Sequence, residues 1–309
     1  MGNLLEINNV AKRYGNYTAL NDVSIQVLKG SVFGLLGPNG AGKTSLIRII
    51  NQITLPDSGA VILDGEPLQP KHIEDIGYLP EERGLYKSMK VGEQALYLAQ
   101  LKGLSKAEAK KKLKYWFEKF DISAWWGKKI EELSKGMAQK VQFIVTVMHE
   151  PKLLIFDEPF SGFDPINAQL IAKEILQLRE EGATVIFSTH RMESVEEMCD
   201  DIALIDKSNK IVEGKLNDIK RQFKSNTFQI GLETNNAAEV TAKIKEKFKV
   251  TPADFKSLND DLKLNIKLKE GSTTSDLLAY LASQGEVKHF TELIPDANDI
   301  FIQAVAKNK

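Results

Sequence analysis

The chain has 309 residues, a length typical of two domains or of one large and one small domain. A net charge of −1 predicts no global attraction to nucleic acid, and the single cysteine, Cys199, excludes an internal disulfide framework and fits a reducing compartment. The first residues lack a signal-peptide pattern, and no apolar run is long enough to span a bilayer. We therefore expect any membrane role to depend on a partner.

Three apolar segments near the amino terminus are predicted strands, at residues 4–10, 19–27 and 31–36. The third leads into residues 37–44, which fit the phosphate-binding loop pattern G-x-x-x-x-G-K-S/T, and a helix is predicted at residues 45–50. Glycines let backbone N–H groups close around phosphate oxygens, and the helix N-terminus adds the positive end of its dipole. This strand–loop–helix order predicts a nucleotide site rather than a turn that binds nothing.

Within this loop, Lys43 can reach the β- and γ-phosphates and the Thr44 hydroxyl can ligate Mg²⁺. The predicted nucleotide-binding residues are Gly37, Pro38, Asn39, Gly40, Ala41, Gly42, Lys43, Thr44 and Ser45.

A turn at residues 55–59 and a strand at 60–65 come next, and residues 89–148 are predicted to be mainly helical. One predicted helix there carries lysines between positions 110 and 119, which favour a solvated face over a docking site for an acidic partner. Ser134 is a candidate N-cap of a helix that runs toward Met148. Such a cap leaves free N–H groups for an anion, although an ordinary capped helix would look the same.

Strands at residues 153–156 and 183–187, with a helix near 168–179 between them, predict a parallel sheet with ligands at its carboxyl edge. Asp157 follows the first strand and can hold Mg²⁺, while its neighbour Glu158 can act as a general base toward water. His190 follows the second strand and is expected at the same edge. There it can contact the γ-phosphate or the attacking water, although a structural histidine fits its position equally well. A closing hairpin is predicted from segments 202–205 and 210–213.

A domain boundary is predicted near residues 219–225, where a polar stretch precedes a new pattern. Two β–α–β-like passes follow and suggest a small α+β domain, for which a ferredoxin-like arrangement is one candidate. The predicted strands are 228–233, 262–268 and 287–293, and the predicted helices are 237–248, 274–283 and 298–306. We expect domains at 1–220, with a helical subdomain at about 89–148, and at 221–309.

The order of these motifs resembles the ATP-binding subunit of ABC transporters, over residues 4–219. The phosphate loop is followed by a signature segment at 133–137, the carboxylates Asp157 and Glu158, a D-loop at 161–164 and the switch histidine His190. This resemblance implies a P-loop ATPase of the α/β class with a mainly parallel core sheet, an antiparallel β-subdomain and a helical subdomain.

The resemblance also implies a role for each motif. Lys43 and the loop amides bind phosphates, Thr44 and Asp157 serve Mg²⁺, Glu158 is the catalytic base, and His190 positions the γ-phosphate and water. The remaining residues that it implies are Tyr14, which stacks on adenine, Asp164, which couples the two sites of a dimer, and the signature residues Ser134, Lys135, Gly136 and Met137, which act on the ATP of a second copy.

Two departures from the family pattern stand out. The usual signature is L-S-G-G-Q, but Lys135 replaces its first glycine and Met137 replaces its glutamine. Glu81 stands where the family has the Q-loop glutamine. A carboxylate can still reach Mg²⁺, directly or through water, because it is a hard oxygen ligand.

Residues 81–86 and the C-terminal extension resemble an exporter branch that includes sodium-extrusion and drug-resistance ATPases. The resemblance implies an ATPase that uses ATP and Mg²⁺, forms a head-to-tail dimer with itself, and drives a polytopic permease from the inner face of the plasma membrane. The alternative is a non-transport ABC ATPase that remodels ribosomes or nucleic acid. The chain has a single phosphate loop, no heptad insertion and no excess of basic residues, and these features disfavour this alternative. For the C-terminal domain, dimer stabilisation is favoured over ligand sensing.

Overall fold

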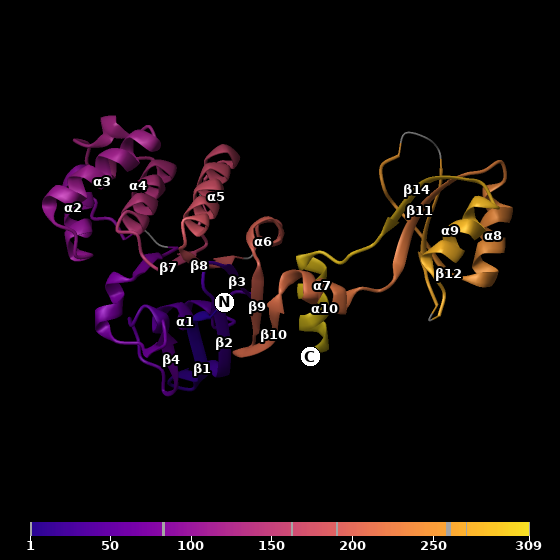
Figure 1. The fold of residues 1–309 in the computed structure, drawn as a ribbon, viewed down its shortest axis with the longest axis horizontal. Helices are drawn as coiled ribbons and strands as arrows, with labels where there is room; N and C mark the ends of the chain where they lie inside the picture. Colours follow the sequence, from indigo (N-terminus) through magenta and orange to yellow (C-terminus); the bar gives the residue numbers. More distant parts are fainter. Residues whose placement is uncertain are drawn as a thin grey trace. The chain divides into compact units, whose positions relative to one another are not determined.

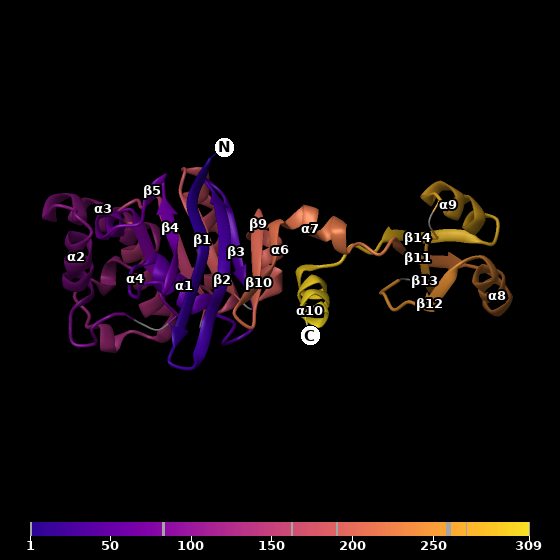
Figure 2. The same ribbon diagram turned by 90° about the horizontal axis from the view of Figure 1, so that it is seen from below.

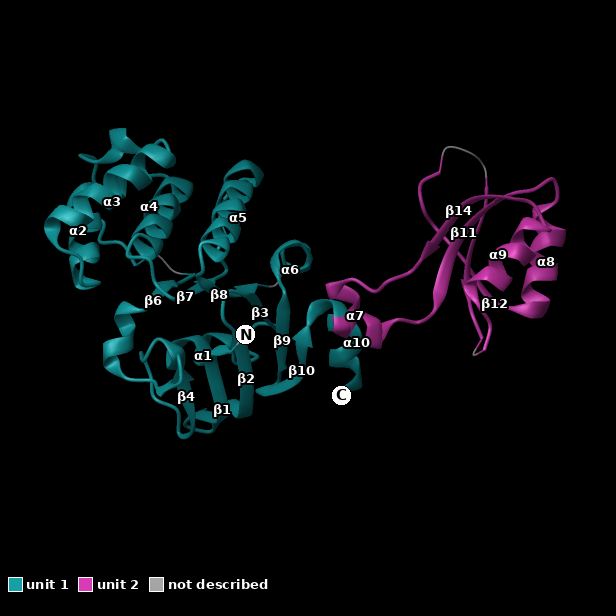
Figure 3. Ribbon diagram, in the orientation of Figure 1, with its two compact units in different colours: residues 1–217, 301–309 teal, residues 218–300 magenta. Residues whose placement is uncertain are grey.

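The computed structural model describes residues 2–81, 84–161, 163–189, 191–257, 261–269 and 271–308. It divides into two compact units (Figure 3): Met1–Asn217 with Phe301–Lys309, and Asp218–Ile300. The sequence places residues 301–309 in the second domain, whereas the structure assigns them to the first unit. The side-chain amide of Asn308 donates to the Asp206 carboxylate at 3.4 Å, a long-range contact that local sequence does not indicate.

An antiparallel sheet opens the first unit. In spatial order it contains β2 (Tyr17–Leu28), β1 (Asn3–Tyr14), β4 (Ser58–Leu63) and β5 (Glu66–Pro67). Apolar side chains of β1, β2 and β4 form one buried cluster with residues of the second sheet and of helix α1 (Lys43–Ile50). Helix α1, which starts with the phosphate-loop lysine, is therefore held within a core to which both sheets contribute.

The second sheet has six strands, and its mainly parallel arrangement is one in which ligands bind at the carboxyl ends of the strands. Its order is β10 (Asn209–Lys215), β9 (Asp201–Asp206), β3 (Val32–Leu36), β8 (Thr184–Thr189), β7 (Leu153–Asp157) and β6 (Ile76–Leu79). All neighbours are parallel except the hairpin of β9 and β10. The carboxyl ends of β3, β6, β7 and β8 consequently meet at one edge.

Three helices group together, as Figure 1 shows: α2 (Val91–Leu101), α3 (Lys106–Lys119) and α4 (Lys135–Val147). The Phe143 ring of α4 stacks on the Phe156 ring of β7 at 5.7 Å, which ties this helical part to the sheet. The other helical elements of the region are η1 (Pro70–Glu74), η2 (Ser123–Trp125), η3 (Ile130–Glu132), α5 (Pro165–Glu180) and α6 (Met192–Met198).

The second unit contains a four-stranded antiparallel sheet in the order β12-β13-β11-β14. Helices α8 and α9 are labelled beside these strands in Figure 2. The apolar side chains of Ile230, Ile244 and Leu277 belong to one buried core that the helices share with the sheet. The chain order β-α-β-β-α-β with this strand order is the ferredoxin-like arrangement. Its elements, with the two helices that flank them, are α7 (Leu216–Phe223), β11 (Thr227–Glu233), α8 (Ala237–Lys247), β12 (Lys249–Pro252), β13 (Leu262–Lys267), α9 (Thr274–Ala282), β14 (Glu286–Glu292) and α10 (Ala297–Lys307).

Among the described residues, no helix has the length and apolar character needed to cross a bilayer.

Candidate functional site

The phosphate loop joins β3 to α1 and requires glycine at two positions. Gly37 has φ of 149° and Gly42 has φ of 119°, conformations that L side chains rarely adopt. A Cβ added at Gly37 would lie 2.2 Å from the Ile205 carbonyl oxygen, and one at Gly42 would lie 2.3 Å from that of Ala19. The loop is therefore pressed against the backbone of β9 and β2, and its shape is fixed by these strands.

Two residues outside the motif also support the loop. The Tyr17 hydroxyl donates to the Gly40 carbonyl oxygen at 2.6 Å, and the Ser208 amide donates to the Ala41 carbonyl oxygen at 3.1 Å. Sequence reasoning missed both residues. Tyr17 lies three positions after Tyr14, and this closeness is the one sequence signal that could have indicated it. Ser208 lies far from the loop in the chain, so the sequence offers no signal for it.

Lys43 lies inside this loop, with 8% of its surface exposed. Its ammonium group donates to the carbonyl oxygens of Gly37 at 2.6 Å and Pro38 at 3.1 Å. Burial lowers the pKa of Lys43, and the negative charges of Glu158, Asp157 and Glu81 oppose that shift. The ammonium thus contacts backbone carbonyl oxygens and lies in the field of three carboxylates, a setting in which it can also bind a phosphate group.

The predicted carboxylate pair lies at the end of β7. Asp157 is 5% exposed, and its carboxylate accepts a hydrogen bond from the Ser188 hydroxyl of the neighbouring strand β8. Burial raises the pKa of Asp157, against the lowering effect of the Ser188 hydrogen bond. Glu158 has φ of 50°, and its amide donates to the Ser188 carbonyl oxygen at 3.0 Å. These contacts turn the chain sharply at the sheet edge and place two adjacent carboxylates there.

Glu81 comes to the same edge from β6. Leu79 of β6 lies opposite Phe156 of β7, so the residues that follow both strands leave the sheet side by side. Burial raises the pKa of Tyr78 to about 12, and the charges of Asp157 and Glu81 add to this increase, which is further evidence that both carboxylates are near. The structure therefore brings Glu81, Asp157 and Glu158 together around Lys43.

Several of the remaining predicted nucleotide contacts are exposed, whereas Ala41 is buried and Ser45 is partly buried. Thr44 at the start of α1 is open to solvent, as are Pro38, Asn39 and Gly40 of the loop. Tyr14 is 44% exposed at the end of β1, and the Lys12 ammonium lies 5.5 Å from its ring centroid. The predicted switch residue His190 lies outside the described residues.

An all-oxygen donor set is available for a metal ion. The Thr44 hydroxyl and the carboxylates of Asp157 and Glu81 match the ligands that Mg²⁺ prefers. In the described part of the chain, no three His, Cys, Asp or Glu side chains are placed to hold a metal by themselves. This fits Mg²⁺ of the nucleotide-bound kind, which uses one or two carboxylates together with substrate phosphates.

The signature segment caps helix α4. The Ser134 side chain accepts a hydrogen bond from the Met137 amide at 3.3 Å, which confirms the predicted N-cap. Lys135 is exposed, and Gly136 and Met137 are partly buried. One turn further along, the Gln139 side-chain amide donates to the Ser161 carbonyl oxygen, a contact that the sequence did not indicate. Among the described residues, no hydrogen bond joins segment 133–137 to the phosphate loop.

Asp164 caps the next helix, α5. Its carboxylate accepts hydrogen bonds from the amides of Ile166 at 3.1 Å and Asn167 at 3.0 Å, as well as from the Asn167 side chain. The Asn167 side chain and amide lower the pKa of Asp164. Ile166 is 80% exposed directly after this cap. The turn at Asp164 is thus fixed by hydrogen bonds, and the start of α5 presents an exposed apolar side chain to its surroundings.

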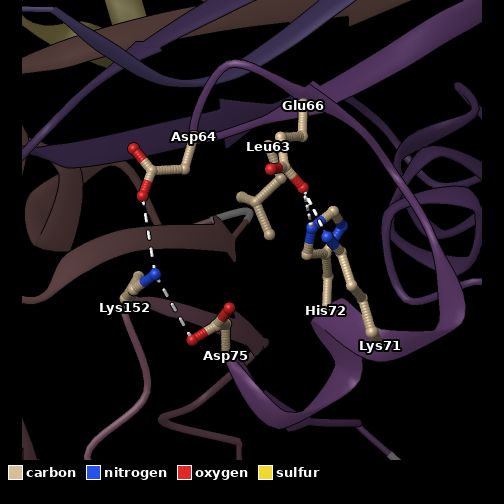
Figure 4. Close-up of a pocket in the computed structure, with 7 residues that line it drawn as sticks. All are labelled: Leu63, Asp64, Glu66, Lys71, His72, Asp75 and Lys152. Carbon is tan, nitrogen blue, oxygen red and sulfur yellow. Dashed lines mark hydrogen bonds and ion pairs between the residues drawn. The ribbon is translucent and has the colours of Figure 1, made fainter.

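A polar pocket lies near the amino ends of β6 and β7, away from the carboxyl edge (Figure 4). In it the Lys152 ammonium lies 3.5 Å from the Asp64 carboxylate and 3.6 Å from that of Asp75. Glu66 pairs in the same way with Lys71 and lies 3.4 Å from His72. Because these charged groups partner one another, the pocket is explained as an ion-pair network at the surface.

Comparisons with known proteins match both units. A model of the family "ABC transporter" matches residues 20–161, and one of the "ATP-binding protein DrrA1-3-like, C-terminal domain" matches residues 214–305. The chain is 40% identical to the ABC transporter ATP-binding protein YhaQ of Bacillus subtilis over 98% of each chain. It is 36% identical to the linearmycin resistance ATP-binding protein LnrL of the same organism over 70% of each chain.

A solved structure of an ATP-binding subunit of an ABC transporter is also similar. It superposes with a TM-score of 0.67 at 31% identity and covers 71% of this chain and 93% of its own.

The burial of Asp157 leads to a prediction about stability. Because burial raises its pKa in the folded protein, the ionised carboxylate destabilises the fold at neutral pH. We expect Asp157→Asn to raise the free energy of unfolding near neutral pH while ATP hydrolysis is lost. The gain should shrink as the pH falls through the folded pKa toward the ordinary aspartate value. Urea unfolding at several pH values measures this, with the exposed Glu180→Gln as the control expected to show little change. A loss of stability at neutral pH in Asp157→Asn would contradict the prediction.

Proposed function

The chain belongs to the ATP-binding subunits of ABC transporters, and we propose that two copies of it close over two ATP molecules to drive a separate membrane permease. Members of this family are ATPases, and their homologues include resistance proteins. The observation that carries the proposal is the meeting of Lys43, Asp157 and Glu158 at one sheet edge. A phosphate-binding ammonium and a candidate general base stand there within reach of one triphosphate.

The loop residues have the first role in this proposal. Lys43 and the backbone amides of 37–45 bind the phosphates, Tyr14 stacks on the adenine, and Thr44 with Asp157 holds Mg²⁺, to which Glu81 adds a further oxygen. Mg²⁺ neutralises charge that develops on the transferred phosphoryl group. The buried setting of Lys43 strengthens its attraction for phosphate, because few water molecules compete.

Glu158 then acts as the base. Its carboxylate takes a proton from a water molecule whose oxygen attacks the γ-phosphorus, and the bond to the β-phosphate oxygen breaks to leave ADP and phosphate. His190 orients the γ-phosphate and the water. The contacts that fix Glu158 support this role: its amide is bound to Ser188, and the Thr189 hydroxyl lies 3.4 Å from its carboxylate.

A second copy supplies the other half of the site. Ser134 and Gly136 of that copy approach the γ-phosphate, at the N-terminus of α4, where unpaired amides favour an anion. Asp164 and the exposed Ile166 lie where two copies would meet, and coupling of the two sites is assigned to Asp164. The absence of hydrogen bonds from the described signature residues to the phosphate loop of their own chain agrees with a role in trans.

An apolar groove is the proposed docking site for the permease. It lies between the sheet and the helical part and is lined by Ile53, Ile73, Tyr78, Leu98 and Leu101, among others. Leu101 is 59% exposed, and Ile53 is also largely exposed. An exposed apolar surface of this kind marks an interaction site. Leu98 and Leu101 belong to residues 79–126, the region that the family resemblance implies for contact with the membrane subunit, which supports permease binding.

Export is the proposed direction, because the linearmycin resistance protein is among the relatives. The permease would hold the subunit at the inner face of the plasma membrane. We assign the ATPase to the first unit and an accessory role, stabilisation of the dimer, to residues 218–300. The relatives give no support to a role in ribosome or nucleic-acid remodelling.

Glu158→Gln tests the catalytic base. The amide keeps the size of the side chain but cannot take a proton, so turnover should fall by about a thousandfold while ATP still binds and dimers accumulate. Phosphate release and size-exclusion chromatography with ATP measure the two effects. Normal ATPase activity in this variant would remove Glu158 from its proposed role.

Ser134→Arg tests the composite site. A large side chain at the cap should block closure over the partner's ATP and abolish hydrolysis, while ATP binding to each separate copy is kept. Nucleotide binding and phosphate release are compared with those of Ser123→Arg, a change at a distant exposed serine. Full hydrolytic activity of Ser134→Arg would refute a site completed by a second copy.

Leu101→Asp tests the docking groove. A carboxylate there should weaken binding of the apolar permease surface, so that the subunit no longer co-purifies with the permease although its own ATPase activity is kept. Leu278→Asp, at another exposed leucine, serves as the matched control. Undiminished co-purification of Leu101→Asp would exclude the groove as the docking site.

A further inference from the structure

The buried face of α5 contains one charged residue. Its buried side chains follow the spacing i, i+3, i+4, i+7 of a helix face that packs on a core, and they are Ile171, Glu174, Ile175 and Leu178. Three of them are apolar, whereas Glu174 is a carboxylate with 5% of its surface exposed. A charge at such a position is costly unless it is paired. The partner of Glu174 therefore bears on how α5 is placed.

That partner is Lys119, the last residue of α3. Its ammonium donates to the Glu174 carboxylate at 2.5 Å and to the Gln177 side-chain oxygen at 3.4 Å. The same ammonium lies 5.0 Å from the Trp116 ring centroid, within the range of a cation–π interaction. Burial lowers the pKa of Lys119, but the hydrogen bond and charge of Glu174, with a contribution from Tyr115, raise it above the ordinary lysine value. A charged pair therefore joins α3 to α5.

A cleft of about 550 Å³ adjoins this pair. Its lining includes Lys112 and Tyr115 of α3 and Leu178 of α5, so packing does not fill all the space between the two helices. Apolar attraction has no preferred direction, whereas a buried ion pair is compensated only in one geometry. The Lys119–Glu174 pair is thus the contact that defines where α3 holds α5.

The segment just before α5 is held to the same group of helices. The Gln139 side chain of α4 donates to the Ser161 carbonyl oxygen, and Asp164 caps α5 by binding the amides of its first turn. The ten steps from Asp164 to Glu174 correspond to about 15 Å of helix rise. After its first residue α5 contains neither proline nor glycine, the usual causes of a kink. Two attachments along a straight helix fix the direction of its axis and hence the position of its cap.

We propose that Lys119 is a positioning residue for Asp164: through Glu174 it sets the rotation and direction of α5, and so aims the cap of α5 at the second copy. The proposal rests on the proposed dimer, in which Asp164 couples the two ATP sites. Lys119 is not among the residues assigned to the nucleotide. Its effect on hydrolysis is therefore transmitted through α5, and the binding of ATP to a single copy does not depend on it.

Lys119→Ala in the full-length chain tests this role. Phosphate release should show kcat lowered about tenfold, because a slight misplacement of a segment that completes an active site is costly. The ATP affinity of a single copy should stay near the parent value, and Lys119→Arg, which keeps the charge, should keep kcat. Lys112→Ala is the matched control. Lys112 lies on the same helix with 27% of its side chain exposed against 25% for Lys119, but it pairs with Glu150 outside α5, so kcat should not change.

A double-mutant cycle locates the path of the effect. If Lys119 acts through the cap of α5, Lys119→Ala should lower kcat in the parent chain but add little in a chain that already carries Asp164→Ala. An equal loss in both backgrounds would show that the effect bypasses Asp164, which would overturn the proposal.

A purely structural role is separated by an apolar replacement of the pair, Lys119→Met with Glu174→Leu. Such replacements often leave stability unchanged or raise it. Urea unfolding should therefore show a free energy no lower than that of the parent, while kcat still falls about tenfold. Parent kcat in this double variant would mean that the pair serves stability alone and would refute the positioning role. If either this variant or Lys119→Ala fails to fold, the kcat of the other decides.

ATP-driven association of chains that carry Glu158→Gln separates this proposal from the one on which it rests. If these chains do not associate with ATP, the proposed dimer is wrong and the positioning role falls with it. If they associate but Lys119→Ala keeps the parent kcat, the dimer stands and the positioning role is refuted.

Discussion

The geometry of the candidate site depends on the burial of one ammonium group near several carboxylates. Lys43 lies inside a loop that two neighbouring strands compress, and the end of β7 brings Asp157 and Glu158 to it. Such a cluster is costly unless its charges compensate one another. The parallel sheet makes it possible, because strands far apart in sequence deliver their following residues to one edge. Burial lowers the pKa of Lys43 and raises the pKa of Asp157, and both shifts arise from this arrangement.

Local features of this site could be predicted from the sequence. The phosphate loop, the carboxylates after β7 and the N-cap at Ser134 each depend on a few adjacent residues and on general backbone rules. The contacts that support the phosphate loop could not be predicted in this way, because Tyr17 and Ser208 reach the loop through tertiary contacts. The same limit explains why strand β12, only four residues long, was missed, and why the end of α10 was placed in the other domain.

Segments of the first unit are also tied to one another at the signature. Gln139 of α4 binds the Ser161 carbonyl oxygen, and a Cβ added at Gly136 would lie 3.9 Å from the Phe163 ring. The start of α4 is thus connected to the turn that follows Glu158. A displacement of α4 by a partner molecule would act on this turn directly, since a short hydrogen-bonded path joins them.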